Sequence, residues 1–363
     1  MKKYLNAKYY LVFIIFIVIA VRFFIYYRNL RFNRFPNGTK IRISARVLSE
    51  PVIYSDSQYI KLMQYKVYLP LYPRIFYGDR IAVEGIVEDK KLKNAKLLKI
   101  IANDNFLYKY REKLISFYES SLPKDHSALV AGMVIGSKSG IGEELWNLLV
   151  KSGTAHVVVA SGMNVSMIAG FLIGALVLFL PRRRAVILAI VGIWLYSIIS
   201  GFEAPIVRAS VMGSTAFLAI ITGRMYSSFR ILIITALLLL FFKPVWVNDL
   251  GFWLSFLATA SIIIFYRKVK KAFYFVPKII NEDWSTTLSA QIGVVPLLYY
   301  YFGQFNILSP IINVAVLWTV VPITIIGMLA GIIGTVIEPL GRGILYLCYP
   351  LTSWFLFVVN IFT

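Results

Sequence analysis

The chain is poor in the residues from which soluble active sites and metal centres are built. Its 363 residues include one cysteine, Cys348, and two histidines, His126 and His156. A single cysteine cannot form a disulfide within the chain, and this set is too small for a recognisable zinc site. Charged residues make up 15% of the chain, whereas soluble domains have roughly 25%. The composition therefore argues against a soluble enzyme and against a disordered chain, and we expect neither a metal nor a cofactor.

Apolar residues are abundant, and acidic residues are scarce. Hydrophobic side chains account for 59% of the chain, which indicates a mostly integral membrane protein. The 38 basic residues outnumber the 17 acidic ones, and 23 of the basic residues lie within residues 1–124. A basic segment attracts polyanions such as nucleic acid or anionic lipid. Ordinary solvation, together with the excess of bases in cytoplasmic loops, is the alternative explanation.

The N-terminal segment predicts a transmembrane anchor over residues 1–30. An apolar run of about 19 residues, from Tyr9 to Tyr27, is long enough to span a bilayer. No small-residue cleavage site follows this run, so we expect the anchor to be retained. Arg22 lies near its end, where a long side chain reaches the membrane surface.

Residues 38–102 change to alternating apolar and polar positions. The run from Lys40 to Val47 alternates with period two, and similar runs lie at 59–62, 65–69, 79–87 and 96–101. About five strands in so short a segment predict a small β-barrel of the OB type.

Helical spacing returns at residues 104–123, which predict an amphipathic helix at the membrane surface. Residues 125–363 then predict a polytopic helical domain. With the anchor we expect about nine spans; those after the anchor cover residues 155–180, 185–200, 205–222, 229–242, 249–266, 286–302, 307–336 and 341–362. Pro310 and Pro322 predict a break within the span 307–336. The glycine pairs Gly170/Gly174 and Gly327/Gly331 predict close helix packing.

Basic residues between the spans predict the orientation. With the N-terminus inside, Arg182–Arg184 and Arg267–Lys271 fall on the inner side, while the opposite loops carry a single base, Lys243. This distribution is the positive-inside pattern. We therefore expect a multi-pass protein of the cytoplasmic membrane with its β domain outside.

Polar residues in the span 155–180 mark a candidate transport path. His156, Ser161 and Asn164 can share much of one helical face, and a polar face in lipid must turn toward partners or water. Hydrogen bonding between helices without a transport role is one alternative. A nucleophile pair of His156 and Ser161 is another, although no orienting acid is in reach and the spacing is poor.

Arg208 is a charged residue inside the apolar span 205–222. Burying it costs at least about 2.5 kcal/mol unless it is paired or hydrated. Glu203 lies five residues earlier, across Pro205. Either the two side chains meet through a bend, or Arg208 faces a hydrated path that suits an anion; a structural ion pair is the alternative to a transport role.

Several motifs resemble those of the ComEC family of competence proteins. The stretch His156–Val165 is similar to the family's HLLAISGLHVG signature, and Ile206–Met212 resembles its VVRAxxM segment. Gly251–Ala258 resembles GFQLSFLA, Gln291–Phe305 resembles the PxxxYYFGQ region, and Tyr77–Gly85 resembles the GDRIxVxG strand of the family's outer domain. Asn164 departs from the second histidine of the first signature, which leaves the role of that position open.

The resemblance implies a channel that passes single-stranded DNA across the cytoplasmic membrane during natural transformation, without enzyme activity of its own. The expected path residues are His156, Ser161, Gly162, Asn164, Glu203, Arg208, Ser255, Gln291 and Asn313. A non-conducting membrane scaffold of the uptake machinery and a membrane hydrolase using His156 and Ser161 are the alternatives. The oligomeric state stays open.

Several partners follow from the same resemblance. Many family members continue into a metallo-β-lactamase-like domain; this sequence shows none, which implies a separate nuclease. No nucleotide-hydrolysing motif is present, so we expect a cytosolic helicase or other ATPase, or a proton gradient, to drive transport. A surface DNA receptor and membrane lipid complete the expected partners.

The expected outer domain combines bases with aromatic rings, a mixture that suits single strands. The expected DNA-binding residues are Arg42, Arg46, Tyr59, Lys61, Tyr65, Lys66 and Tyr68. Anchoring of the rings at a membrane surface is the alternative.

Overall fold

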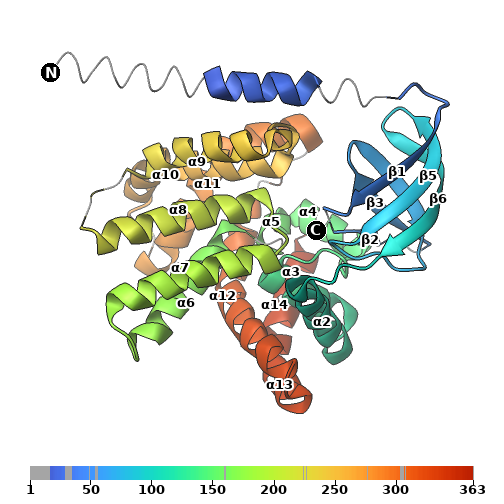
Figure 1. Cartoon of the computed structure of the whole chain (residues 1–363). Coiled ribbons are helices and arrows are strands. Elements are labelled where there is room, and N and C mark those ends of the chain that lie inside the picture. The colour runs from blue at the N-terminus through green and yellow to red at the C-terminus, as the bar shows by residue number, and fades with distance from the viewer. Residues whose placement is uncertain are drawn as a thin grey trace.

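A small sheet near the N-terminus lies beside a body of helices (Figure 1). The structure is a computed structural model that describes residues 17–28, 35–48, 50–53, 56–158, 161–223, 225, 227–275, 277–302, 306 and 308–362. Of the expected anchor, residues 17–28 are helical and residues 1–16 lie outside the described part. Arg22 Nε donates to the carbonyl of Phe241, 3.2 Å away, so this side chain bonds to the helical body.

The sheet has six strands in the order β1-β5-β6-β4-β3-β2. They are β1 (Lys40–Arg46), β2 (Val52–Ile53), β3 (Ser57–Leu62), β4 (Tyr65–Pro70), β5 (Arg80–Glu88) and β6 (Lys91–Ile101). Neighbours are antiparallel except β4 and β6, which are parallel over two residue pairs. Because β1 and β2 are its two edges, the sheet is open and the expected closed barrel is not confirmed. The sequence pattern misses β2, since two residues are too few to alternate.

Period-two alternation decides which side chains of the sheet face inward. In β4, Tyr65, Val67 and Leu69 are buried, whereas Lys66 and Tyr68 are exposed. Buried residues of the other strands complete this core. Each buried leucine or valine contributes roughly 1.5–3 kcal/mol, so the inward set fixes the register and leaves the outward set available for other roles.

The turn before β5 is built on Gly78 and Asp79. Gly78 has a φ of +95°, which a residue with a side chain rarely adopts. The buried Asp79 carboxylate accepts the backbone N–H groups of Phe76, at 2.8 Å, and Asn103, at 3.0 Å. The turn therefore fastens the start of β5 to the segment that leaves β6.

The helices of the body follow the sheet in the chain. They are α2 (Phe106–Ser121), α3 (Lys124–Ile135), α4 (Glu143–Ser152), α5 (Ala155–Val158), α6 (Gly162–Val177), α7 (Arg182–Ile199), α8 (Ala204–Ile221), α9 (Ser228–Phe242), the 3-10 helix η1 (Pro244–Asn248), α10 (Leu250–Ala272), α11 (Lys278–Phe302), α12 (Ser309–Gly334), α13 (Glu338–Leu345) and α14 (Cys348–Ile361).

Five helical segments of the described chain are long and apolar enough to cross a bilayer. They cover Ala155–Val177, Ala204–Ile221, Leu250–Ala272, Ser309–Gly334 and Glu338–Ile361. α9 is apolar but shorter, and α7 begins with three arginines. The nine expected spans are therefore not confirmed, while a mostly helical chain with five candidate membrane-spanning segments among the described residues is.

α12 runs at the centre of the body without the expected break. Pro310 lies in its first turn, where no backbone donor is needed. Pro322 lies inside the helix, and buried neighbours such as Val320 and Ile323 pack around it. Packing therefore keeps the helix continuous although one backbone hydrogen bond is missing.

α2 is part of the same core and does not lie as a separate helix on the body. It packs on α3 and α12, with Leu114, Phe117 and Tyr118 buried. Arg111 is also buried, although the sequence pattern places it on the polar side of the helix.

Of the two glycine pairs expected to allow close packing of helices, Gly327/Gly331 does so and Gly170/Gly174 does not. A Cβ at Gly331 would overlap the Tyr118 hydroxyl, and one at Gly327 would lie 2.7 Å from Val134 Cγ2. Nothing lies within 4 Å of the Cβ positions of Gly170 and Gly174. The second pair therefore does not hold helices together in the described structure.

These glycines offer a matched test of the core. We expect Gly331→Ala to lower the stability of the chain by about 1–3 kcal/mol, because Tyr118 must move in a filled core. Gly174→Ala is the control; it should be neutral or stabilise by up to about 1 kcal/mol through helix propensity. Thermal unfolding of the purified chain in detergent measures both, and equal midpoints for the two variants would show that α2 and α12 are not tightly packed.

Candidate functional site

The Arg208 site lies where α8 faces α6 and α10; we define it as Arg208, Gly162, Ser255 and Thr259. Arg208 is in the second turn of α8 and is only 9% exposed. Its Nε donates to Ser255 Oγ at 2.8 Å, and its Nη1 donates to Thr259 Oγ1 at 2.6 Å. Ser255 and Thr259 are one helical turn apart on α10, so both hydroxyls meet the same guanidinium.

The guanidinium also lies against the start of α6. A Cβ at Gly162 would be 2.7 Å from Arg208 Nη2, so a side chain at this position would displace the arginine. The ring of Phe256 lies on another side, 5.9 Å from the guanidinium carbon. The close approach of Arg208 therefore explains why position 162 is a glycine, which has no side chain.

No carboxylate balances this charge within the described chain. Arg208 is in none of the seven ion pairs of the described residues. Glu203, which the sequence allows as its partner, pairs with Lys138 at 3.0 Å instead. A buried guanidinium whose described partners, two hydroxyls, the Met212 sulfur and the Phe256 ring, are all neutral is able to accept an anion.

The polar residues of the preceding segment are divided between two helices. His156 lies on α5, Ser161 has an extended backbone and Asn164 lies in the first turn of α6, so the single helical face expected for these residues is interrupted at Ser161; residues 159 and 160 lie outside the described part of the chain. The His156 side chain is exposed although Val157 and Val158 are buried.

Asn164 is fully buried. Its Nδ2 donates to the carbonyl of Met133 at 2.7 Å. Among the described hydrogen bonds none joins His156 to Ser161, and this pairing would be needed for nucleophilic catalysis.

Gln291 and Asn313 belong to a different group of contacts. Both side-chain amides donate to Ser309 Oγ, at 3.5 and 3.2 Å. Gly153 faces the same hydroxyl, because a Cβ there would overlap Ser309. These two predicted path residues are therefore joined to each other and are not in contact with the Arg208 site.

The sheet and the helical body meet at a cluster that the sequence does not reveal. We call Glu50, Arg111, Ser137, Lys138 and Glu203 the junction cluster. Arg111 Nη2 pairs with Glu50 Oε1 at 3.2 Å. The same carboxylate accepts Ser137 Oγ at 2.8 Å and the Lys138 backbone N–H at 2.6 Å. Glu50 follows β1, so this single side chain fastens the sheet to the end of α3.

Arg111 also binds the ends of two helices. Its Nη1 donates to the carbonyls of Ile135 and Ile199, at 2.6 and 2.5 Å. These residues close α3 and α7, where carbonyls lack helical partners and the helix dipole is negative. Position 111 alone gives little signal, since its neighbours in space come from residues far along the chain.

A tyrosine adds a second attachment of the sheet to the body. Tyr77 Oη donates to the carbonyl of Gly201 at 3.0 Å and packs edge-on against Tyr108. Burial raises the pKa of Tyr77 to about 12, so the hydroxyl stays protonated and remains a donor at neutral pH.

Three buried oxygens near Arg111 and Glu203 lie within reach of one another but make no hydrogen bond of good geometry in the described structure. They are Asn164 Oδ1, Tyr196 Oη and Ser200 Oγ. Buried polar atoms of this kind are usually satisfied by water. The interior here is therefore polar, whereas the core around α12 is apolar.

The residues of β3 and β4 that are expected to bind DNA do not all lie on the outward face of the sheet. Lys61 lies directly opposite Lys66, and Tyr59 opposite Tyr68, with the two rings 5.3 Å apart. Tyr65 does not join them, because it is 4% exposed and faces the core. It alternates with the two outward residues of its strand, so it does not share their face, and its role in binding stays a prediction.

Arg42 and Arg46 lie on β1, beside β5. Arg42 is opposite Glu84, whereas Arg46 is opposite a second arginine, Arg80. Like charges in opposite positions repel unless an anion lies between them. Arg80 is thus a candidate contact that was missed, although its place beside the turn at Gly78 is visible in the sequence.

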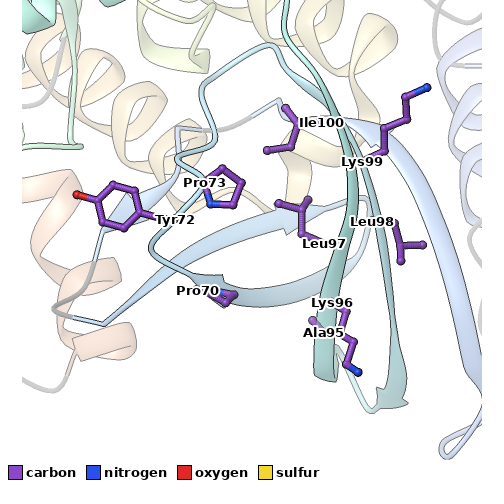
Figure 2. A pocket seen from close by; sticks show the side chains of 9 residues that line it. All are labelled: Pro70, Tyr72, Pro73, Ala95, Lys96, Leu97, Leu98, Lys99 and Ile100. Atoms are coloured by element: carbon purple, nitrogen blue, oxygen red, sulfur yellow. The ribbon is translucent and has the colours of Figure 1, made fainter.

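A pocket of about 580 Å³ opens beside β6. Figure 2 shows Pro70 and Pro73 on one side and Leu97 and Ile100 on the other. β4 and β6 part after two paired residues, and the chain leaving β4 forms the far wall. Lys96 and Lys99 also line the pocket.

Comparison with known proteins assigns a family to the helical body. A sequence profile described as competence protein matches residues 133–363. The chain is 28% identical to ComE operon protein 3 of Bacillus subtilis over 217 residues, which are 58% of this chain and 27% of that protein. It is 26% identical to competence protein ComA of Neisseria gonorrhoeae over 222 residues, 56% of this chain and 30% of that protein.

Recombination protein 2 of Haemophilus influenzae is 26% identical over 150 residues, 39% of this chain and 19% of that protein. The matched segments thus span less than a third of these relatives. No solved structure matches the chain. The profile begins within α3 and includes the Arg208 site, but it excludes the sheet.

The junction cluster predicts how firmly the sheet is held. Glu50→Ala leaves the Arg111 charge buried without its acid, so we expect a loss of about 3–5 kcal/mol of stability at the junction. Limited proteolysis of the full chain in detergent should then cut within residues 35–104 faster than in the wild type. Glu84→Ala is the control, because its ion pair with Lys40 is exposed. Equal cleavage of the two variants would show that Glu50 does not hold the sheet.

Proposed function

Because the chain belongs to the competence protein family, whose profile matches residues 133–363, we propose that it conducts single-stranded DNA across the cytoplasmic membrane during natural transformation. The family supports a role in DNA uptake, and the conducting role is our proposal. The observation that carries it is the Arg208 site, a buried cation without an acid inside an apolar helix.

A positive charge in this position suits an anionic polymer. Charged residues within membrane spans are costly, so they commonly mark a pathway for ions or substrates. The exposed His156 side chain supplies hydrophilic surface before α6, and the buried polar atoms around Asn164 make the interior beside it polar. The neutral hydroxyls of Ser255 and Thr259 orient the guanidinium but leave its charge uncompensated.

The sheet supplies a strand-binding surface on the outer side in this proposal. Tyr59 and Tyr68 offer rings on which bases stack, and Lys61 and Lys66 lie beside them for the phosphates. The repelling pair Arg46 and Arg80 would be relieved by a phosphate. The antiparallel pairs β3–β4 and β5–β6 support an OB-type assignment, which we keep as part of the proposal.

Orientation follows from charge. We place the N-terminus and the basic segments Arg182–Arg184 and Arg267–Lys271 inside, the sheet outside, and about nine spans between them. Each phosphate that moves toward a negative interior costs about 2.3 kcal/mol per 100 mV. A cytosolic helicase or other ATPase, or a coupled proton gradient, is therefore part of the proposal, as are a surface DNA receptor and a separate nuclease.

Uptake of labelled DNA tests the conducting role. Deleting the gene should abolish transformation and nuclease-protected internal DNA, while DNA bound at the cell surface stays at the wild-type level. DNA delivered by electroporation is the control, since it bypasses the channel and should still transform the deletion strain. Unchanged internal DNA in the deletion strain would end the proposal.

A non-conducting scaffold is distinguished by substitution in the body. A scaffold inserts and recruits partners whatever its interior chemistry, so Ser255→Ala with Thr259→Val would leave transformation normal. If transformation stays normal in that double variant, and hydrolysis of a lipid or glycan is lost in both His156→Ala and Ser161→Ala, the protein is instead a membrane hydrolase.

The outward face of the sheet makes a separate prediction. We expect Tyr68→Ala to weaken binding of an oligo(dT) strand to the full chain by about 1–3 kcal/mol, the usual contribution of a stacked base. Fluorescence anisotropy in detergent measures the affinity. Tyr274→Ala is the control, because that ring is 82% exposed at the end of α10. A similar loss for both variants would indicate non-specific stacking.

A further inference from the structure

The first turn of α6 and the guanidinium of Arg208 meet in an arrangement that is electrostatically unfavourable without a ligand. A helix N-terminus carries the positive end of the helix dipole, and it stabilises anions and not cations. Arg208 Nη2 nevertheless lies against Gly162, the first residue of α6. The guanidinium and the positive end of α6 therefore lie close together in an apolar helix bundle.

Nothing in the described structure neutralises this pair. The preceding residue, Ser161, is in an extended conformation, but its side chain does not accept from the first-turn amides. Arg208 donates through Nε and Nη1 to two hydroxyls, and its Nη2 makes no hydrogen bond to another described residue. The side chain is 9% exposed, so bulk water does not supply the missing counter-charge.

We propose that the first turn of α6 and Arg208 together bind one phosphodiester group of the passing strand. We call this arrangement the phosphate station. It rests on the proposed function and adds the group that is held. A non-bridging phosphate oxygen accepts from Nη2 and from the free amides at the helix start, as anions do at other helix N-termini.

Gly162 is essential to this geometry. Without a side chain, the guanidinium reaches the α6 backbone, and the phosphate is able to contact both at once. Ser161, Gly162 and the 36% exposed Met163 leave the start of α6 open on one side. Ser255 and Thr259 are positioning residues, because they act only by holding Arg208.

Because the phosphate station contacts only the sugar-phosphate backbone of the DNA, it recognises the charge of the strand and not its base sequence. It therefore accepts any base, and it rejects a strand whose linkages are uncharged. It holds one phosphate, so it provides one step of a path along which the strand advances.

Salt dependence of binding tests the phosphate station directly. The full chain is placed in zwitterionic nanodiscs, with Lys61→Gln and Lys66→Gln in every sample to reduce binding by the sheet. The logarithm of oligo(dT) affinity is then plotted against the logarithm of salt concentration. Each phosphate contact contributes a slope of about 0.7 for single strands, so we expect Arg208→Gln to reduce the slope by about that amount. Arg208→Lys should keep the slope, and a methylphosphonate strand should bind wild type and Arg208→Gln equally.

Two further variants separate charge from folding. Gly162→Ala keeps every charge but displaces the guanidinium, so it should reduce the slope as Arg208→Gln does. Arg230→Gln removes an arginine at the start of α9 and should leave the slope unchanged. Slopes that are unchanged in both Arg208→Gln and Gly162→Ala would overturn the phosphate station. If wild-type cells still take up DNA normally in that case, the conducting role is unaffected.

Nanodiscs that contain anionic lipid test whether a lipid headgroup, and not the DNA strand, supplies the bound phosphate. If lipid headgroups fill the site, anionic lipid lowers strand binding by the wild type more than by Arg208→Gln, and the strand is not its occupant. If the lipid has the same effect on both, the station belongs to the strand. Absence of uptake in wild-type cells, with the slopes as expected, would instead end the conducting role.

Discussion

The attachment of the sheet to the helical body depends on one buried cation. Arg111 binds the carbonyl ends of α3 and α7, and Glu50 brings the sheet to the same guanidinium. The cation is stable there because three negative features surround it: two helix C-termini and one carboxylate. The start of α8 follows directly from the end of α7, so the placement of Arg208 also depends on this contact.

Arg111 and Arg208 show how the surroundings of a buried arginine decide its role. Both are almost fully buried, and both donate to groups on other helices. Arg111 meets two helix C-termini and an acid, so these groups compensate its charge and the side chain stabilises the fold. Arg208 meets neutral hydroxyls and lies beside the start of α6, so no described acid compensates its charge, and the proposed phosphate contact rests on this difference. The sequence places Arg208 in an apolar span and Arg111 on the polar side of an amphipathic helix, and it shows the partners of neither.

Local patterns predicted the elements well and their contacts poorly. Alternation along β4 identified the strand, and the same alternation could have shown that Tyr65 faces inward with Val67. Hydrophobicity alone continues the span 155–180 through Ser161, whereas the structure has an extended backbone there, and the transport role of the motif stays a prediction. Glu50, Ser137 and Glu203 meet only through tertiary packing, so no spacing in the sequence links them. The open edge of the sheet likewise depends on pairing between distant strands.

The position of Glu50 has a consequence for how such proteins diversify. The family profile starts within α3 and does not include the sheet, which Glu50 and the Tyr77 hydroxyl attach to the body. A different N-terminal module would fit the same place if its linker delivered an acidic side chain to the end of α3. Exchange of that module would then leave the contacts of Arg111 with the ends of α3 and α7 unchanged.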